Sequence, residues 1–215
     1  MALALCGAFL VGGLGEATAE TELSAYIGFQ EAAHGRLQGD DPGGVGAVNE
    51  LIAWEGRSFS MPPYYGFRAT WWRANDLGFG IEFNHAKVYA SDESLAATGF
   101  SRLEMTDGLN LVTANAFKRW SREDRDWTSY AGLGVGVAIP HVDIKSTGGT
   151  TYEYQLTGPA VQAVAGISYP LAENRALFGE YKFTYSWHDV DLASGGSLET
   201  QFATNAVNFG YSWSY

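Results

Sequence analysis

The sequence predicts an all-β fold, a single eight-stranded antiparallel barrel whose strands cross a membrane. Three observations lead to this prediction. Large apolar residues alternate with small or polar ones along most segments, long and short connections alternate between the segments, and the tryptophans gather near one set of connections. Successive side chains of a strand point to opposite faces, so such alternation indicates two different surroundings for the two faces.

The last segment, TNAVNFGYSWSY (204–215), shows the alternation most clearly. Every second position holds a large apolar residue, and small or polar residues occupy the positions between them. The apolar set is Val207, Phe209, Tyr211, Trp213 and Tyr215, and the other set is Asn208, Gly210, Ser212 and Ser214. The segment 108–120 alternates poorly, and we expect a β-bulge there.

Eight segments have strand character, and their connections fall into two classes. The segments are 22–33, 62–73, 77–90, 108–120, 127–141, 156–170, 175–189 and 200–215. The connections 73–78, 120–127 and 170–175 are short and polar, whereas 34–61, 91–107, 142–155 and 190–199 are longer. Outer-membrane barrels have short periplasmic turns and long outward loops, and this alternation is typical of them.

The positions of the seven tryptophans support the same fold. Trp71, Trp72, Trp120, Trp127 and Trp213 lie beside the predicted short turns, while the other two lie toward the long loops. Indole rings collect at the boundary between lipid and water. A soluble antiparallel β-barrel, such as a ligand-binding lipocalin, is the alternative, but its apolar faces would point inward.

Composition limits the classes of function. The 215 residues carry a formal net charge of −11, which argues against nucleic acid as a partner. Cys6 is the only cysteine, so the chain forms no intramolecular disulfide and no cysteine-based metal site.

Residues 1–19 have the apolar run and the Ala17-Thr18-Ala19 motif of a secretory signal peptide. No Lys or Arg precedes that run, so we expect the natural start to lie further upstream. The mature chain, 20–215, is then one barrel in the outer membrane, without a transmembrane helix.

Several polar residues occupy strand positions whose side chains point into the predicted barrel. They are Arg68, Thr70, Glu82, Asn84, Gln162, Glu180 and Lys182. An eight-stranded barrel is just wide enough to be filled by side chains, and charged groups inside it must be paired. We therefore expect a structural ion-pair network in the lumen and no open pore.

All four histidines map to the outer rim, at the long-loop ends of alternate strands. They are His34, His85, His141 and His188. Imidazole performs acid–base chemistry near neutral pH and binds transition metals. His85, His141 and His188 are the catalytic candidates, and His34, His141, Asp143 and His188 are the candidate metal ligands. The alternation of side chains along each strand places His34 and His188 inward and the other two outward, so one four-ligand site is not expected. The alternative is that all four are ordinary interfacial polar residues.

Two further sets of residues suggest chemistry at the same rim. Ser186 precedes His188 by two positions on the same face, which favours a serine–histidine hydrolase with Glu180 or Asp189 as the orienting carboxylate. Arg36, Lys87 and Lys145 lie in the upper half and are candidates to bind lipid phosphates, with divalent ions assisting because the chain is acidic. The glycines of GLGVGVA (132–138) are not followed by a helix start, so they do not form a phosphate-binding loop.

Four segments resemble the outer-membrane lipid A oxidases of lipopolysaccharide-modifying bacteria. They are GFGIEFNHAKVYA (78–90), GLGVGVAIPHVDIK (132–145), YEYQLTGPAVQA (152–163) and EYKFTYSWHDVDL (180–192). The resemblance implies oxygen-dependent oxidation of the proximal glucosamine of lipid A, at its dephosphorylated anomeric carbon, to 2-aminogluconate with release of hydrogen peroxide. It covers nearly the whole mature chain and adds Tyr154 to the lipid-binding candidates.

A reaction with molecular oxygen usually needs a redox cofactor. The sequence has no flavin or nicotinamide fingerprint, so bound iron or copper is the expected cofactor. Lipid A or lipopolysaccharide is the expected partner of a monomeric barrel. Two alternatives stay open: a non-enzymatic structural or adhesion barrel like OmpX, and a lipid A acyl hydrolase that uses Ser186 and His188.

Overall fold

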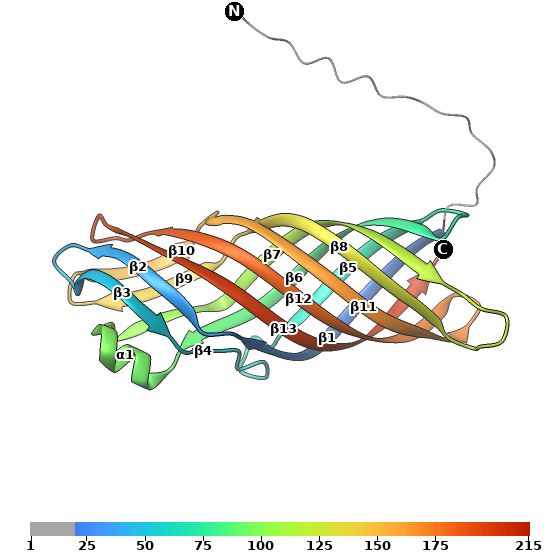
Figure 1. Ribbon diagram of the computed structural model, residues 1–215, viewed down its shortest axis with the longest axis horizontal. Coiled ribbons are helices and arrows are strands. Elements are labelled where there is room, and N and C mark those ends of the chain that lie inside the picture. The colour runs from blue at the N-terminus through green and yellow to red at the C-terminus, as the bar shows by residue number, and fades with distance from the viewer. Residues whose placement is uncertain (1–19) are drawn as a thin grey trace, which may run out of the picture.

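Eight long strands close into a barrel in the computed structural model, which describes residues 20–215. The expected signal peptide, residues 1–19, lies outside the described residues. The strands are β1 (Glu20–Ala32), β5 (Tyr65–Trp72), β6 (Leu77–Ala90), β7 (Arg102–Trp120), β8 (Thr128–Ala138), β11 (Gly158–Ala172), β12 (Arg175–Asp191) and β13 (Ser197–Ser214). Each pairs antiparallel with the next in this order. β13 returns to β1, from Glu22 opposite Ser214 to Ala32 opposite Thr204, and closes the ring (Figure 1).

The long connections build an extension on one end of the barrel, which we call the outer end (Figure 1). A hairpin of β2 (Gly35–Asp41) and β3 (Gly46–Ile52) pairs with β13. β4 (Trp54–Glu55) pairs with β6, and a hairpin of β9 (His141–Ser146) and β10 (Gly149–Tyr154) pairs with β7. The short helix α1 (Asp92–Thr98) starts at Ser91, whose hydroxyl accepts from the Ser94 amide. The C-terminus lies at the other end, the inner end, with the short turns.

The alternation of the sequence becomes an apolar outer wall and a polar lumen. Outward side chains of every barrel strand are exposed and apolar, and they include Ile27, Phe67, Ile81, Val112, Leu133, Val161, Tyr181 and Phe209. Glu82, Glu180 and Lys182 are buried inside. The soluble alternative is therefore wrong, because the large apolar faces point outward. The described part of the chain contains no helix that is long and apolar enough to cross a membrane.

Two details of the sequence prediction are decided by local geometry. The bulge expected within 108–120 lies at the outer edge of that segment: residues 109–118 pair regularly with β6, and the register shifts where Leu109 and Met105 face Ala86 and Val88, so β7 is the bulged strand. Trp72 does not join the other tryptophans at the outer surface. It follows Trp71 directly, points into the lumen, and is buried beneath Arg119.

The lumen is filled by one connected polar network to which every barrel strand contributes. Arg68 donates to Glu180 at 2.9 Å, and Lys182 pairs with Glu82, so two cations balance two carboxylates. Neutral groups complete the network: Tyr26, Tyr130, Asn208, Gln162 and Asn115. The Glu82 carboxylate accepts from Tyr26 and Gln162, and the Glu180 carboxylate accepts from Tyr130 and Asn208. The expected ion-pair network is confirmed.

Replacement of Lys182 by methionine tests the network. The Lys182→Met variant leaves Glu82 with only Arg68, at 3.5 Å, as a charged partner. Removing one member of a buried pair costs about 3–5 kcal/mol of unfolding free energy. Urea unfolding of the barrel in bilayers measures this loss. The control is Arg122→Met in the exposed 120–127 turn, whose pair with Asp124 should contribute about 1 kcal/mol or less. Equal stabilities of the two variants would contradict the prediction.

Candidate functional site

Two of the four histidines meet in one pocket on the outer wall of the barrel, just below the extension. We call it the rim pocket. It has a volume of about 440 Å³ and is lined by Pro62, Tyr65, Phe83, His85, Asp107, Asn110, His141 and Tyr154. These residues come from five strands and one connection, so the site exists only when the barrel and the β9–β10 hairpin are both formed.

The strand register explains how the pocket is assembled. His85 on β6 lies between Tyr65 of β5 and Asn110 of β7. Above Asn110, the bulge of β7 brings Asp107 to the same face, with Gly108 at a φ of 115°, which favours glycine. The chain leaves β8 after Ala138, and the amide of Ile139 donates to the Asn110 carbonyl at 2.7 Å. β9 then begins at His141. The bulge and the end of β8 therefore create the space between the two histidines.

His85 is held in one orientation. It is 4% exposed, stacks on the Tyr65 ring at a centroid distance of 4.9 Å, and places Nδ1 2.9 Å from Asn110 Oδ1. The amide oxygen is an acceptor, so Nδ1 carries the proton and Nε2 carries the lone pair. His85 Nε2 is buried and has no hydrogen-bond partner. A fixed imidazole with a free lone pair is suited to accept a proton or bind a metal ion.

His141 lies on the other side of the pocket. It is 5% exposed and contacts the rings of Tyr152 and Tyr154 edge-on, at centroid distances of 4.4 and 4.7 Å. Its Nδ1 has no hydrogen-bond partner and lies 3.7 Å from Asp107 Oδ2. Tyr152 donates to Asp107 Oδ2 at 3.2 Å, and Tyr154 donates to the Asp107 carbonyl at 3.4 Å. The hydrogen bond to the Asp107 carboxylate raises the pKa of the Tyr152 phenol.

The rim pocket opens where the apolar wall meets the extension. Phe83 lines it from below and pairs in register with the lipid-facing side chains of Phe67 and Val112. Above it, Arg102 pairs with Asp143 at 2.8 Å. A molecule in the pocket would thus contact apolar side chains at one end and polar groups at the other.

The four metal ligands proposed from the sequence are not brought together. His34 and His188 line a second pocket beside β12 and β13, and Asp143 is engaged by Arg102, whereas His141 belongs to the rim pocket. His34 is exposed rather than inward, because β1 ends at Ala32 and its alternation stops there. Among the side chains described for residues 20–215, no group of three or more His, Cys, Asp or Glu residues is arranged to hold a metal ion.

The lipid-binding candidates are also dispersed. Only Tyr154 lines the rim pocket. Lys87 is fully buried, and its ammonium group donates to the carbonyls of Ser60 and Pro62, both at 2.9 Å, so it is not presented to a lipid phosphate. Arg36 is exposed and donates to Asn49, and Lys145 is exposed on β9.

His188 and Ser186 form a hydrogen-bonded pair inside the barrel. His188 Nε2 lies 2.7 Å from Ser186 Oγ, and its Nδ1 lies 2.7 Å from Thr157 Oγ1. A hydroxyl thus occupies the place of the expected carboxylate. Glu180 is bound to Arg68, and Asp189 points to the opposite face. The pair satisfies its own hydrogen bonds and is buried, which is the ordinary state of polar groups in a filled lumen.

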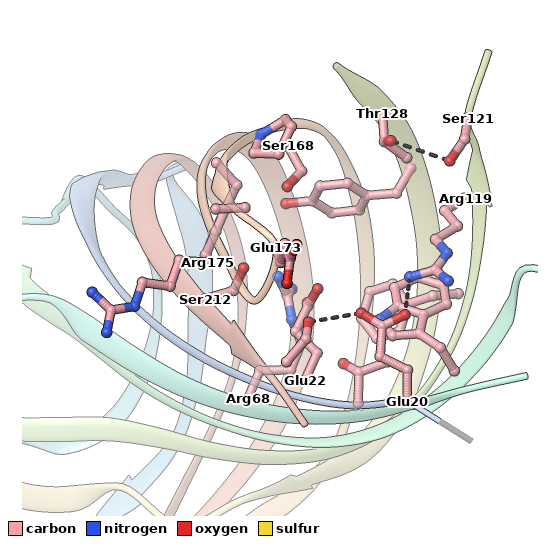
Figure 2. A pocket seen from close by; sticks show the side chains of 18 of the residues that line it. Glu20, Glu22, Arg68, Arg119, Ser121, Thr128, Ser168, Glu173, Arg175 and Ser212 are labelled. Carbon is pink, nitrogen blue, oxygen red and sulfur yellow. Dashed lines mark hydrogen bonds and ion pairs between the residues drawn. The ribbon is translucent and has the colours of Figure 1, made fainter. Parts of the chain in front are cut away.

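A third cavity, of about 180 Å³, lies in the lumen at the inner end (Figure 2). Figure 2 shows Glu20 joined to Arg119, and Ser121 joined to Thr128, around its mouth, with Arg68 among its lining residues. The side chains that line this cavity include no histidine. It ends at the polar network and does not reach the rim pocket through the lumen.

Sequence reasoning missed Asp107, Asn110, Tyr65 and Pro62. The local signal for the first two was the poor alternation of 108–120, which marked the bulge but not the residues that it would place beside the histidines.

Comparisons with known proteins identify the fold. No protein-family model matches the chain, and no curated protein matches it. The chain is similar to solved structures of outer-membrane proteins, and two of them cover nearly its whole length. Neisserial surface protein A, NspA, is 14% identical, with 94% of this chain and 100% of that one covered and a TM-score of 0.52. The outer-membrane protein AlkL, solved in lipid bilayers, is 14% identical, with coverages of 98% and 97% and a TM-score of 0.53.

The closed ring, the exposed apolar wall and these similarities define the class. The chain is a small eight-stranded β-barrel of the outer membrane, and its outer end carries the rim pocket.

The contact between Tyr152 and Asp107 gives a prediction about titration. The Asp107→Asn variant removes the carboxylate that raises the pKa of Tyr152, so the phenol should ionise at a lower pH than in the wild-type protein. NMR of ¹³Cζ-labelled tyrosine, with the signal assigned by Tyr152→Phe, measures this. An unchanged titration of Tyr152 would show that the two side chains are not in contact in the membrane.

Proposed function

We propose that this protein is a lipid A oxidase of the outer membrane. Its substrate is the proximal glucosamine of lipid A with a free anomeric hydroxyl, and its products are 2-aminogluconate and hydrogen peroxide. One observation carries the proposal beyond the family resemblance. A pocket on the lipid-facing wall contains two buried imidazoles whose nitrogens, His85 Nε2 and His141 Nδ1, have no hydrogen-bond partner in the protein.

The position and charge of the rim pocket support a lipid-linked sugar as the ligand. Acyl chains would lie along the exposed wall of β6 and β7, where Ile81 and Val112 face outward, and the sugar would reach the pocket from the leaflet. The lining residues include the carboxylate of Asp107 and no Lys or Arg. Such a lining favours an uncharged sugar hydroxyl over a phosphate, in agreement with a substrate that has lost its anomeric phosphate.

The reaction requires a base at the anomeric hydroxyl. Oxidation of the hemiacetal to the lactone breaks the C1–H and O–H bonds, and two electrons and two protons pass to molecular oxygen, giving hydrogen peroxide. Water then opens the lactone to the acid. His85 Nε2 is the group placed to accept the hydroxyl proton, because Asn110 keeps the ring proton on Nδ1. General base catalysis of this kind contributes about 10²–10⁴-fold to a rate.

Iron or copper is the cofactor that we propose for the step with oxygen. His141 and the carboxylate of Asp107, which lie 3.7 Å apart, are the residues that would hold it, an imidazole and an oxygen donor of the kind that iron and copper accept, while His85 Nε2 stays free as the base. When bound, the metal would supply the one-electron chemistry that reaction with molecular oxygen needs. This set replaces the one proposed from the sequence, whose members lie in different places.

Two alternatives have an observation in their favour. The overall similarity to NspA and AlkL is equally consistent with a structural or adhesion barrel without enzyme activity. The hydrogen bond between His188 and Ser186 is the geometry of an activated serine, as in a lipid A acyl hydrolase, although both residues are buried inside the barrel.

Mass spectrometry separates the three functions. Lipid A lacking its anomeric phosphate is incubated with the folded protein in bilayers, in air and under argon. The oxidase adds one oxygen atom in air only and produces hydrogen peroxide. A hydrolase releases an acyl chain in both atmospheres. A structural barrel changes no lipid mass in either, and that result would exclude the proposed reaction.

Histidine variants test the assignment of the site. His85→Gln and His141→Gln should each lower the oxidation rate by about 10²-fold or more, because glutamine keeps a polar side chain but cannot exchange a proton. His188→Gln is the matched control, since His188 is equally buried but lies in the lumen. The heat-modifiable mobility of each barrel on gels verifies folding. A control that loses as much activity as the two rim variants would move the site to the lumen.

Removal of metal tests the cofactor. Treatment with a chelator should abolish the oxidation, and addition of iron(II) or copper(II) should restore it. Metal analysis of the purified barrel gives a second readout, with less bound metal expected in His141→Gln than in His188→Gln. Full activity in a protein shown to be free of metal would exclude a metal cofactor.

A further inference from the structure

The connection between β4 and β5 contains a loop that leaves the barrel wall. We call residues 58–62 the lateral loop. Figure 1 shows it projecting from the wall next to β4, nearer to the middle of the barrel than the hairpins of the extension. Its tip carries Phe59 and Met61, which are 72% and 83% exposed. Two large apolar side chains so exposed at the tip of a loop indicate a surrounding other than water.

The base of the loop is fixed by buried polar contacts. The Tyr64 amide donates to the Ser58 carbonyl at 2.8 Å and closes the loop. Ser58 Oγ accepts from the Gln30 amide at 2.7 Å and donates to the Gln30 carbonyl at 2.9 Å, which attaches the loop to β1. Lys87 of β6 donates to two carbonyls of the loop. The side chains of the tip are therefore held away from the barrel by the backbone below them.

The surroundings of the tip are continuous with the lipid-facing wall. Ile27 and Phe29 of β1 point outward, and the ring of Phe29 lies 6.4 Å from the ring of Phe59. Before the loop, Arg57 pairs with Glu55 and lies over the Tyr89 ring at 4.7 Å. An apolar tip next to a charged base matches the boundary between acyl chains and headgroups.

The lateral loop also borders the rim pocket, because Pro62 lines that pocket and follows Met61 directly. We propose that the lateral loop is inserted into the outer leaflet, with Phe59 and Met61 among the acyl chains, and forms the lipid-facing lip of the rim pocket. A lipid whose headgroup occupies the pocket then has its chains in contact with this lip. Lys87 is the positioning residue of the lip rather than a ligand of a lipid phosphate. This inference goes beyond the proposed oxidation and does not depend on it.

Site-directed spin labelling measures the depth of the loop. In a Cys6→Ser background, which removes the only native cysteine, a nitroxide is attached at Met61→Cys in bilayers, and its collisions with oxygen and with a water-soluble nickel chelate are compared. Ile27→Cys is the control on the lipid-facing wall, and Ala47→Cys, exposed on the β2–β3 hairpin, is the control in water.

The label at position 61 should resemble the label at position 27, with high oxygen and low chelate accessibility. A label at Phe59→Cys should give the same result, which guards against a local effect of one substitution. Accessibility like that of position 47 would place the loop in water and overturn the proposal. Protection from both reagents would also overturn it, because the tip would then be covered by protein, such as a second copy of the chain.

Discussion

The structure depends on the pairing of buried charges in the lumen of the barrel. Arg68, Lys182, Glu82 and Glu180 are buried at the centre of the barrel, and each isolated charge would be very costly there. The cost is offset because neutral donors from the remaining strands complete the coordination of the two carboxylates. Since every strand contributes a member, the network is satisfied only when all eight strands are in register. It therefore favours the register of the closed barrel over other pairings of the strands.

With the lumen filled, the outer wall is the surface on which this chain can meet a ligand from the membrane. The rim pocket arises there from local departures from a regular barrel. β5 begins only at Tyr65, so its neighbours β1 and β6 extend further toward the outer end than it does. β7 bulges beyond Leu109, and β8 stops at Ala138. Each departure leaves space or redirects a side chain, and the β9–β10 hairpin covers the result. A regular barrel would present only lipid-facing apolar residues at this level.

The histidines show how one residue type takes different roles according to its surroundings. His188 faces the lumen, where hydroxyl groups satisfy both of its ring nitrogens. His85 and His141 line the rim pocket on the outer wall, and each keeps a buried nitrogen without a hydrogen-bond partner. A satisfied imidazole contributes to packing, whereas an unsatisfied one costs free energy and persists where a ligand compensates for it. This contrast is the reason to place the chemistry at the rim.

The sequence by itself determined the barrel, the number of its strands, which face of each strand meets lipid, and the charged content of the lumen. These follow from alternation and loop length, which are local properties of the chain. It also identified His85, His141 and Tyr154 as rim residues. Only the tertiary structure decided that these three meet Asp107 and Asn110, that Lys87 holds a loop, and that Ser186 and His188 are enclosed. Those contacts depend on the register between strands distant in sequence and on a bulge of two residues, and a shift of one position would have moved each side chain to the other face of the wall.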